Sequence, residues 1–285
     1  MRGNRRRWTL IVATGSVVTV FAALAALASG ALSQHQKSVD IAAAADGTAT
    51  ASCPSGTEAV SGGFSAPGFD PQFDQASNIP FGSRRAGKDG WKVDAKNFGT
   101  ASGTLVSYVY CDRHRPGLTV ALKTVTIDAR TTDSAAAKCP RGTEAYSGGW
   151  KSPANVTGDD AFFAFTSMRA SDRKWKVTAF NDDNDDAHDL QAFAYCDKRK
   201  PGLVERSKDT TVAGGVKTSL TPKCPGGRQA VSGGFESSEL TPNKADAAFT
   251  ITSRRGSTST WRTVAYGNGG PTDESPITAF AYCKA

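Results

Sequence analysis

A single sequence pattern occurs three times in this chain of 285 residues. The pattern runs from Cys-Pro-x-Gly through Ser-Gly-Gly-aromatic, Arg and Trp to Tyr-Cys, and each copy begins some residues before its first cysteine. Self-similarity at a fixed period, here about 85 residues, indicates that one structural unit has been duplicated. The copies span residues 34–117, 118–202 and 203–285. A unit of this length is near the lower limit of an autonomous domain, so we interpret the chain as three small tandem domains.

The pattern uses all six cysteines, two in each copy. Sequence alone allows many pairings, but the duplication favours one disulfide inside each copy. Each bridge would close a loop of about 58 residues and stabilise its copy by roughly 4 kcal/mol. Such bridges need an oxidising compartment outside the cytoplasm. The predicted pairs are Cys53–Cys111, Cys139–Cys196 and Cys224–Cys283.

Residues 1–33 lie outside the repeats and have the features of an export signal. Four arginines precede an uncharged stretch from Trp8 to Ser33. Small residues at Ala26-Leu27-Ala28 and at Ala31-Leu32-Ser33 offer cleavage sites. The stretch is also long enough for an uncleaved membrane anchor. We expect a secreted or cell-surface protein that contacts a membrane only through this segment.

The basic charge of the chain belongs mostly to this leader. Four of the 34 basic residues lie in it, so 30 remain against 27 acidic residues and the formal charge falls from +7 to +3. The clustered basic face of a nucleic-acid-binding protein is therefore not expected.

The local patterns within each copy predict strands. Leu190, Ala192 and Ala194 alternate with Gln191 and Phe193 before Cys196, which indicates a strand covered on both faces. Another strand is predicted after each Trp, and the paired glycines indicate a bulge or a close backbone approach. Each Cys-Pro-x-Gly segment suits a type I turn. The expected class is all-β, with about five or six strands per copy in a small sandwich.

The Cys-Pro-x-Gly, Gly-Gly-aromatic, Trp and aromatic-x-Cys elements resemble repeats of exported actinobacterial proteins, mostly without assigned function. This resemblance covers residues 37–285. The Cys-Pro and Gly-Phe elements are also similar to those of the vitelline membrane outer layer protein family, which has a three-fold β-prism. That similarity implies a closed three-fold assembly as the alternative to separate domains, and it points to carbohydrate.

Trp91, Trp175 and Trp261 occupy the same place in each copy, with an arginine a few residues upstream. An exposed indole beside a guanidinium suits the stacking of a sugar, whereas a buried indole is the ordinary core residue of a small β domain. The candidate arginines are Arg84 or Arg85, Arg169, and Arg254 or Arg255, of which we take Arg84, Arg169 and Arg254.

Only the second copy carries an acidic loop, residues 182–189. Its oxygen ligands make it a weak calcium candidate, but the EF-hand pattern fails at Ala187 and Phe193, so no metal or other cofactor is expected. The candidate ligands would be Asp182, Asn184, Asp186 and Asp189.

The chain has few candidate catalytic residues, so we do not expect an enzyme. His188 has no nucleophile-elbow sequence to accompany it. Glu58 and Glu144 suggest paired carboxylates, but Gln229 replaces them in the third copy. Binding residues are instead expected on the variable loops 65–82, 151–164 and 236–248.

The expected function is non-catalytic binding of extracellular carbohydrate or a cell-envelope polymer by three equivalent modules, with avidity. The competing hypothesis is a structural or protein-interaction component of the cell surface without a small ligand. An enzyme or enzyme inhibitor is the third hypothesis.

Overall fold

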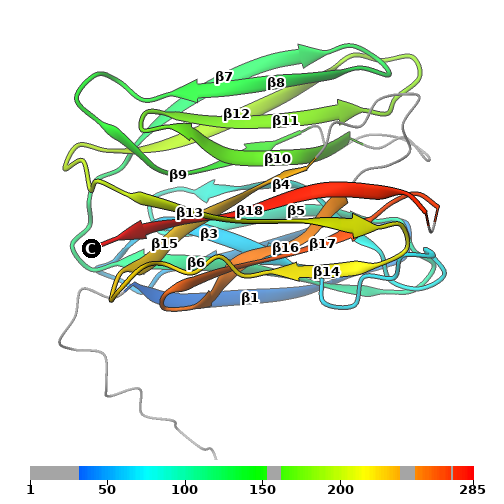
Figure 1. Cartoon of the computed structure of the whole chain (residues 1–285), viewed down its shortest axis with the longest axis horizontal. Helices are drawn as coiled ribbons and strands as arrows, with labels where there is room; N and C mark the ends of the chain where they lie inside the picture. Colours follow the sequence, from blue (N-terminus) through cyan, green and yellow to red (C-terminus); the bar gives the residue numbers. More distant parts are fainter. Residues whose placement is uncertain (1–31, 153–161, 238–247, 271) are drawn as a thin grey trace, which may run out of the picture. The chain divides into compact units, whose positions relative to one another are not determined.

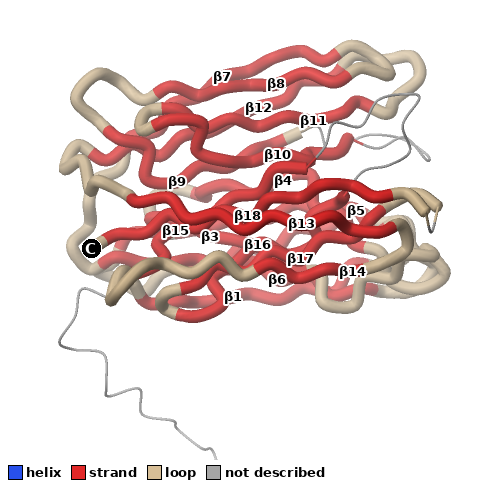
Figure 2. The backbone as a smooth tube through the Cα atoms, viewed as in Figure 1, coloured by secondary structure: helices blue, strands red, loops and turns tan. Residues whose placement is uncertain are grey.

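The computed structural model describes residues 32–152, 162–237, 248–270 and 272–285, and these are all strand, turn or loop. Figure 2 shows the strands running side by side, with the connections at their ends. The predicted all-β class is confirmed, with six strands in each copy and all three predicted disulfides formed. Residues 1–31 of the predicted leader lie outside the described residues, and Ser33 is the first residue of β1.

The eighteen strands form three antiparallel six-stranded sheets, and each sheet takes three strands from each of two copies. Sheet A joins the first and third copies, sheet B the first and second, and sheet C the second and third (Figure 1). Sheet A has the order β1 (Ser33–Ile41), β6 (Gly103–Asp112), β3 (Glu58–Ser65), β16 (Ala248–Ser257), β17 (Thr260–Gly267) and β14 (Lys217–Leu220). Sheet B has the order β2 (Asp46–Ser52), β5 (Gly90–Asn97), β4 (Asn78–Ala86), β9 (Glu144–Lys151), β12 (His188–Asp197) and β7 (Thr119–Ile127). Sheet C has the order β13 (Val204–Ala213), β18 (Glu274–Lys284), β15 (Gln229–Ser237), β10 (Phe162–Ser171), β11 (Lys174–Asn181) and β8 (Thr132–Lys138).

This exchange of half-sheets corrects the interpretation as three separately packed domains and matches the closed three-fold alternative. Residues 31–285 form one compact unit. The largest cluster of buried apolar residues draws on all three copies. At its centre the rings of Phe64, Trp150 and Phe235 make edge contacts, with centroids 5.7 to 6.3 Å apart. Each sheet is therefore complete only when two copies contribute three strands each.

The paired glycines allow the close packing of this core. A Cβ atom on Gly148 would overlap the indole of Trp175, and one on Gly149 would overlap the backbone carbonyl of Ser83 in the first copy. The predicted close approach is thus confirmed, whereas the bulge falls earlier, at Val60, Tyr146 and Val231.

The Cys-Pro-x-Gly turns differ from the prediction in their register. The Thr57 N–H donates to the Pro54 carbonyl at 3.2 Å, so proline is first in the turn and Gly56 is third. Gly56 has φ of 83°, which a type II turn requires at its third position and type I does not. The same arrangement recurs at Gly142 and Gly227.

Candidate functional site

The three tryptophans lie in the interior and cannot serve as exposed sugar platforms. Trp91, Trp175 and Trp261 are 1 to 2 % exposed. Each indole N–H donates to a buried serine at 2.9 to 3.0 Å. The space beside the three indoles is about 20 Å³, enough for one water and too small for a pyranose. Burial therefore corrects the platform assignment and agrees with the core interpretation.

The arginines upstream of each Trp divide into two sets, because neighbouring residues on a strand point to opposite faces. In the first set, the backbone N–H groups of Arg85, Arg169 and Arg255 each donate to a tyrosine hydroxyl of another copy, all at 2.7 Å. The acceptors are Tyr195, Tyr282 and Tyr110. Arg169 was grouped with Arg84 and Arg254 on sequence grounds, but it belongs to this structural set.

The paired carboxylates that were considered for catalysis also have structural roles. Glu58 accepts the N–H groups of Gly117 and Leu118 and pairs with Arg85. Glu144 does the same for Gly202, Leu203 and Arg169. In the third copy the amide oxygen of Gln229, in the orientation that satisfies its neighbours, accepts the Leu32 N–H at 2.9 Å. Through these contacts the first copy holds the start of the second, the second holds the start of the third, and the third holds the start of the first.

The acidic loop of the second copy is organised around Asp183. Its carboxylate accepts the N–H groups of Asp185 and Asp186, and it contacts His188 Nε2 at 2.9 Å. These backbone hydrogen bonds, followed by His188, lower the pKa of Asp183 to about 2. Within the described residues, no group of three acidic, histidine or cysteine side chains is arranged to hold a metal ion. The candidate calcium ligands have other positions or contacts: Asp182 pairs with Arg130, Asp189 accepts from Thr126, and Asn184 and Asp186 are exposed.

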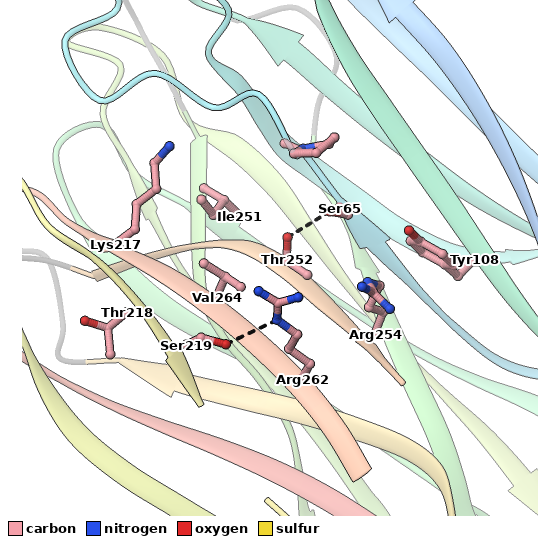
Figure 3. Close-up of a pocket in the computed structure, with 12 residues that line it drawn as sticks. Ser65, Tyr108, Lys217, Thr218, Ser219, Ile251, Thr252, Arg254, Arg262 and Val264 are labelled. Atoms are coloured by element: carbon pink, nitrogen blue, oxygen red, sulfur yellow. Dashed lines mark hydrogen bonds between the residues drawn. The ribbon is translucent and has the colours of Figure 1, made fainter. Parts of the chain in front are cut away.

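A groove of about 450 Å³ lies beside the seam where β3 of the first copy meets β16 of the third (Figure 3). We call this the basic groove, because Lys217, Arg254 and Arg262 line it and none of the described residues that line it is acidic. Among the described residues, none of these three cations takes part in an ion pair within 4.0 Å of an acidic oxygen. Its other lining residues are Ser65, Ala66, Pro67, Tyr108, Thr218, Ser219, Ile251, Thr252 and Val264.

Neutral groups position the cations of the basic groove. Arg254 lies over the ring of Tyr108, with 5.3 Å between the guanidinium carbon and the ring centroid, and its Nη1 donates to the Arg255 carbonyl. The Arg262 Nε donates to the Ser219 hydroxyl at 3.2 Å (Figure 3). The Lys217 ammonium donates to the Phe69 carbonyl. These contacts fix the side chains without neutralising them.

The equivalent position on sheet B holds a second groove, of about 360 Å³, in which two acidic residues offset most of the charge of Arg84, Lys92 and Lys151. Asp94 pairs with Arg84 at 2.6 Å and with Lys92 at 3.2 Å, and it accepts the Thr48 hydroxyl. Burial alone would raise the pKa of Asp94, but the hydrogen bonds from Arg84 and Thr48 and the nearby charges hold it below its usual value. Asp46 also lines this groove.

The variable loops that were expected to bind a ligand are described only in part. Residues 153–161 and 238–247 lie outside the described residues. The first loop borders the basic groove through Ala66 and Pro67, and the nearby Asp70 accepts the N–H groups of Gln72 and Gln75.

Comparison with protein-family models gives no match, and comparison with curated proteins gives none either. Within the described part of the chain, no helix is long and apolar enough to cross a membrane.

Proposed function

We propose that this chain is a secreted, non-catalytic binding protein that contacts extracellular carbohydrate or a cell-envelope polymer. The observation that carries this proposal is the divergence of the sheet surfaces over a shared interior. The copies repeat the Trp, Tyr, Ser and Gly-Gly contacts of the core, yet the outward positions beside the seams differ in charge. Rigid scaffolds with variable exposed positions are the usual arrangement of binding proteins. The three disulfides fit the oxidising environment outside the cytoplasm.

The test is retention of the secreted chain on insoluble cell-wall material and on neutral and acidic polysaccharides. We expect retention by the wild type, and reduced retention when Arg254→Gln and Arg262→Gln are combined. A double variant with Arg113→Gln and Lys198→Gln is the matched control, because it removes two cations at exposed residues away from the groove. Absence of retention on every polymer would contradict the proposal.

The buried indoles favour a second candidate function, a structural or protein-interaction component of the cell surface. Equivalent Trp-based sites on three copies were the main argument for trivalent sugar binding, and burial removes it. This candidate predicts no retention on any glycan, together with capture of a defined protein partner from surface extracts.

For the leader, we predict that the mature chain retains Leu32. Leu32 is buried, its N–H donates to Gln229, and its carbonyl accepts from Arg255 at 3.1 Å. Cleavage at Ala31-Leu32-Ser33 would remove these contacts and the first residue of β1, whereas cleavage at Ala26-Leu27-Ala28 would keep them. The intact mass of the secreted protein distinguishes the two sites. A mature chain that begins at Gln34 would contradict this expectation.

A further inference from the structure

We propose that the basic groove on sheet A is a single binding site for an anionic group carried on a hydroxyl-rich chain, such as the carboxylate or phosphodiester of an acidic polysaccharide or polyol phosphate polymer. This inference rests on the proposed function and names its ligand class. It also replaces three equivalent sites with one.

The comparison between copies shows where the unbalanced charge comes from. Val264 and Asp94 both stand three residues after the Trp of their copy. Asp94 forms an ion pair with Arg84 on the neighbouring strand of sheet B. Val264 has no carboxylate, so the corresponding Arg254 has no acidic partner among the described residues that line the groove. Lys217 lies opposite Tyr266, just as Asp46 lies opposite Lys96, so a cation in sheet A takes the place of a second acid. Two exchanges thus convert a nearly balanced groove into a cationic one.

The third sheet does not repeat this arrangement. At the corresponding positions of sheet C, Met168 replaces the arginine, Thr178 replaces Asp94, and Glu236 lies at the seam where Ser65 lies in sheet A. Lys176 is the one cation that remains among these described positions. Of the two grooves, the one on sheet B also has three lining cations but two acids beside them, so three cations without an acid are found on sheet A only, within the described residues.

One donor of the basic groove lacks a hydrogen-bond partner. The Nε of Arg254 is buried and has no hydrogen-bond partner. A buried donor without a partner is costly, and guanidinium groups form their strongest hydrogen bonds with carboxylate and phosphate oxygens. Figure 3 shows the Thr252 hydroxyl beside the Arg262 head group, and Arg254 next to Tyr108. Arg254 and Arg262 lie opposite each other on β16 and β17, and two guanidinium groups that line one groove suit one polyatomic anion.

The rest of the lining suits a hydroxyl-rich backbone around that anion. The hydroxyl groups of Ser65 and Thr252 hydrogen-bond each other at 2.9 Å, and Thr218 and Ser219 add two more. The apolar side chains of Ile251 and Val264 offer contacts for the carbon atoms of a sugar or polyol. Small-molecule sites combine apolar walls with a few placed polar groups in this way.

The test is titration calorimetry of the secreted chain with five probes: oligogalacturonate, poly(glycerol phosphate), polyglutamate, a neutral glucan oligomer and inorganic phosphate. Binding to oligogalacturonate or to poly(glycerol phosphate) identifies the carboxylate or the phosphodiester as the source. We expect no measurable binding of the neutral oligomer, and weaker binding of inorganic phosphate than of either polymer. If polyglutamate binds as tightly as the two hydroxyl-rich polymers, the groove recognises negative charge alone, and the hydroxyl-rich part of the proposal is overturned.

Two variants exploit the difference between the sheets. Val264→Asp places in sheet A the carboxylate that sheet B already has, so binding should weaken about tenfold or more, because the added acid competes for both arginines. Asp94→Val should create the opposite effect, a gain of binding on sheet B, because it releases Arg84 and Lys92. A gain of binding with unchanged thermal stability does not result from misfolding.

The outcomes separate this inference from the proposed function. If the chain is retained on envelope material but Val264→Asp binds as tightly as the wild type, the site is elsewhere and only this inference fails. If no anionic probe binds and no envelope material retains the chain, both proposals fail. Loss of binding in Val264→Asp with unchanged thermal stability supports both.

Discussion

The second copy alone, residues 118–202, is expected to remain unfolded as a monomer. Its strands β7, β9 and β12 need β2, β4 and β5 of the first copy to complete sheet B. Its other three strands need β13, β15 and β18 to complete sheet C. Without them, Trp175 loses the ring of Tyr282, whose centroid lies 5.6 Å away, and the unpaired edges of β9 and β10 are exposed. A chain of this size has little stability to spare for such losses.

The measurements are near-ultraviolet circular dichroism and thermal unfolding of the oxidised fragment at micromolar concentration, with the whole chain from Leu32 as control. The whole chain should unfold in one transition, because its copies share one core. A fragment that folds only as a trimer would agree with the closed arrangement, since three copies could exchange half-sheets. A folded monomeric fragment would contradict it.

The sequence predicted the strands and the disulfides well, since both depend on features internal to one copy. The alternation before Cys196 marks β12, and the segment after Trp175 marks β11. The exchange of half-sheets was not predictable by the same reasoning. Alternation shows which side chains are buried but not which copy supplies the covering strand. A sandwich of separate domains and a closed ring both bury Trp175, so only the three-fold resemblance pointed to the ring.

The candidate site was harder to predict, because its signal is a one-residue difference in register. Arg84 and Arg85 are neighbours, yet one lines a groove and the other donates its N–H to Tyr195. In the second copy Met168 takes the outward position, so counting back from Trp175 finds only the structural Arg169. The sequence shows that Val264 of the third copy stands where the first copy has Asp94. Its effect on the charge of the groove depends on which strands meet at the seam. Alignment of the copies by their strand register would have found it.

The disulfides have a larger role in the closed arrangement than in separate domains, because each one joins two sheets. Cys53 follows β2 of sheet B and pairs with Cys111 in β6 of sheet A. Cys139 follows β8 of sheet C and pairs with Cys196 in β12 of sheet B. Cys224 follows β14 of sheet A and pairs with Cys283 in β18 of sheet C. Every pair of sheets is therefore linked covalently once.

Replacing Cys139 and Cys196 together by alanine is expected to lower the free energy of unfolding by about 4 kcal/mol, because the bridge closes a segment with a sequence separation of 57. Urea unfolding of the purified chain measures this change. The other two bridges have separations of 58 and 59, so removing either one should cost nearly the same. Removing all three should unfold the chain, since the summed loss is comparable to the whole stability of an ordinary domain, about 5 to 15 kcal/mol. A loss below about 1 kcal/mol for a single bridge would mean that the shared core holds the sheets together without it.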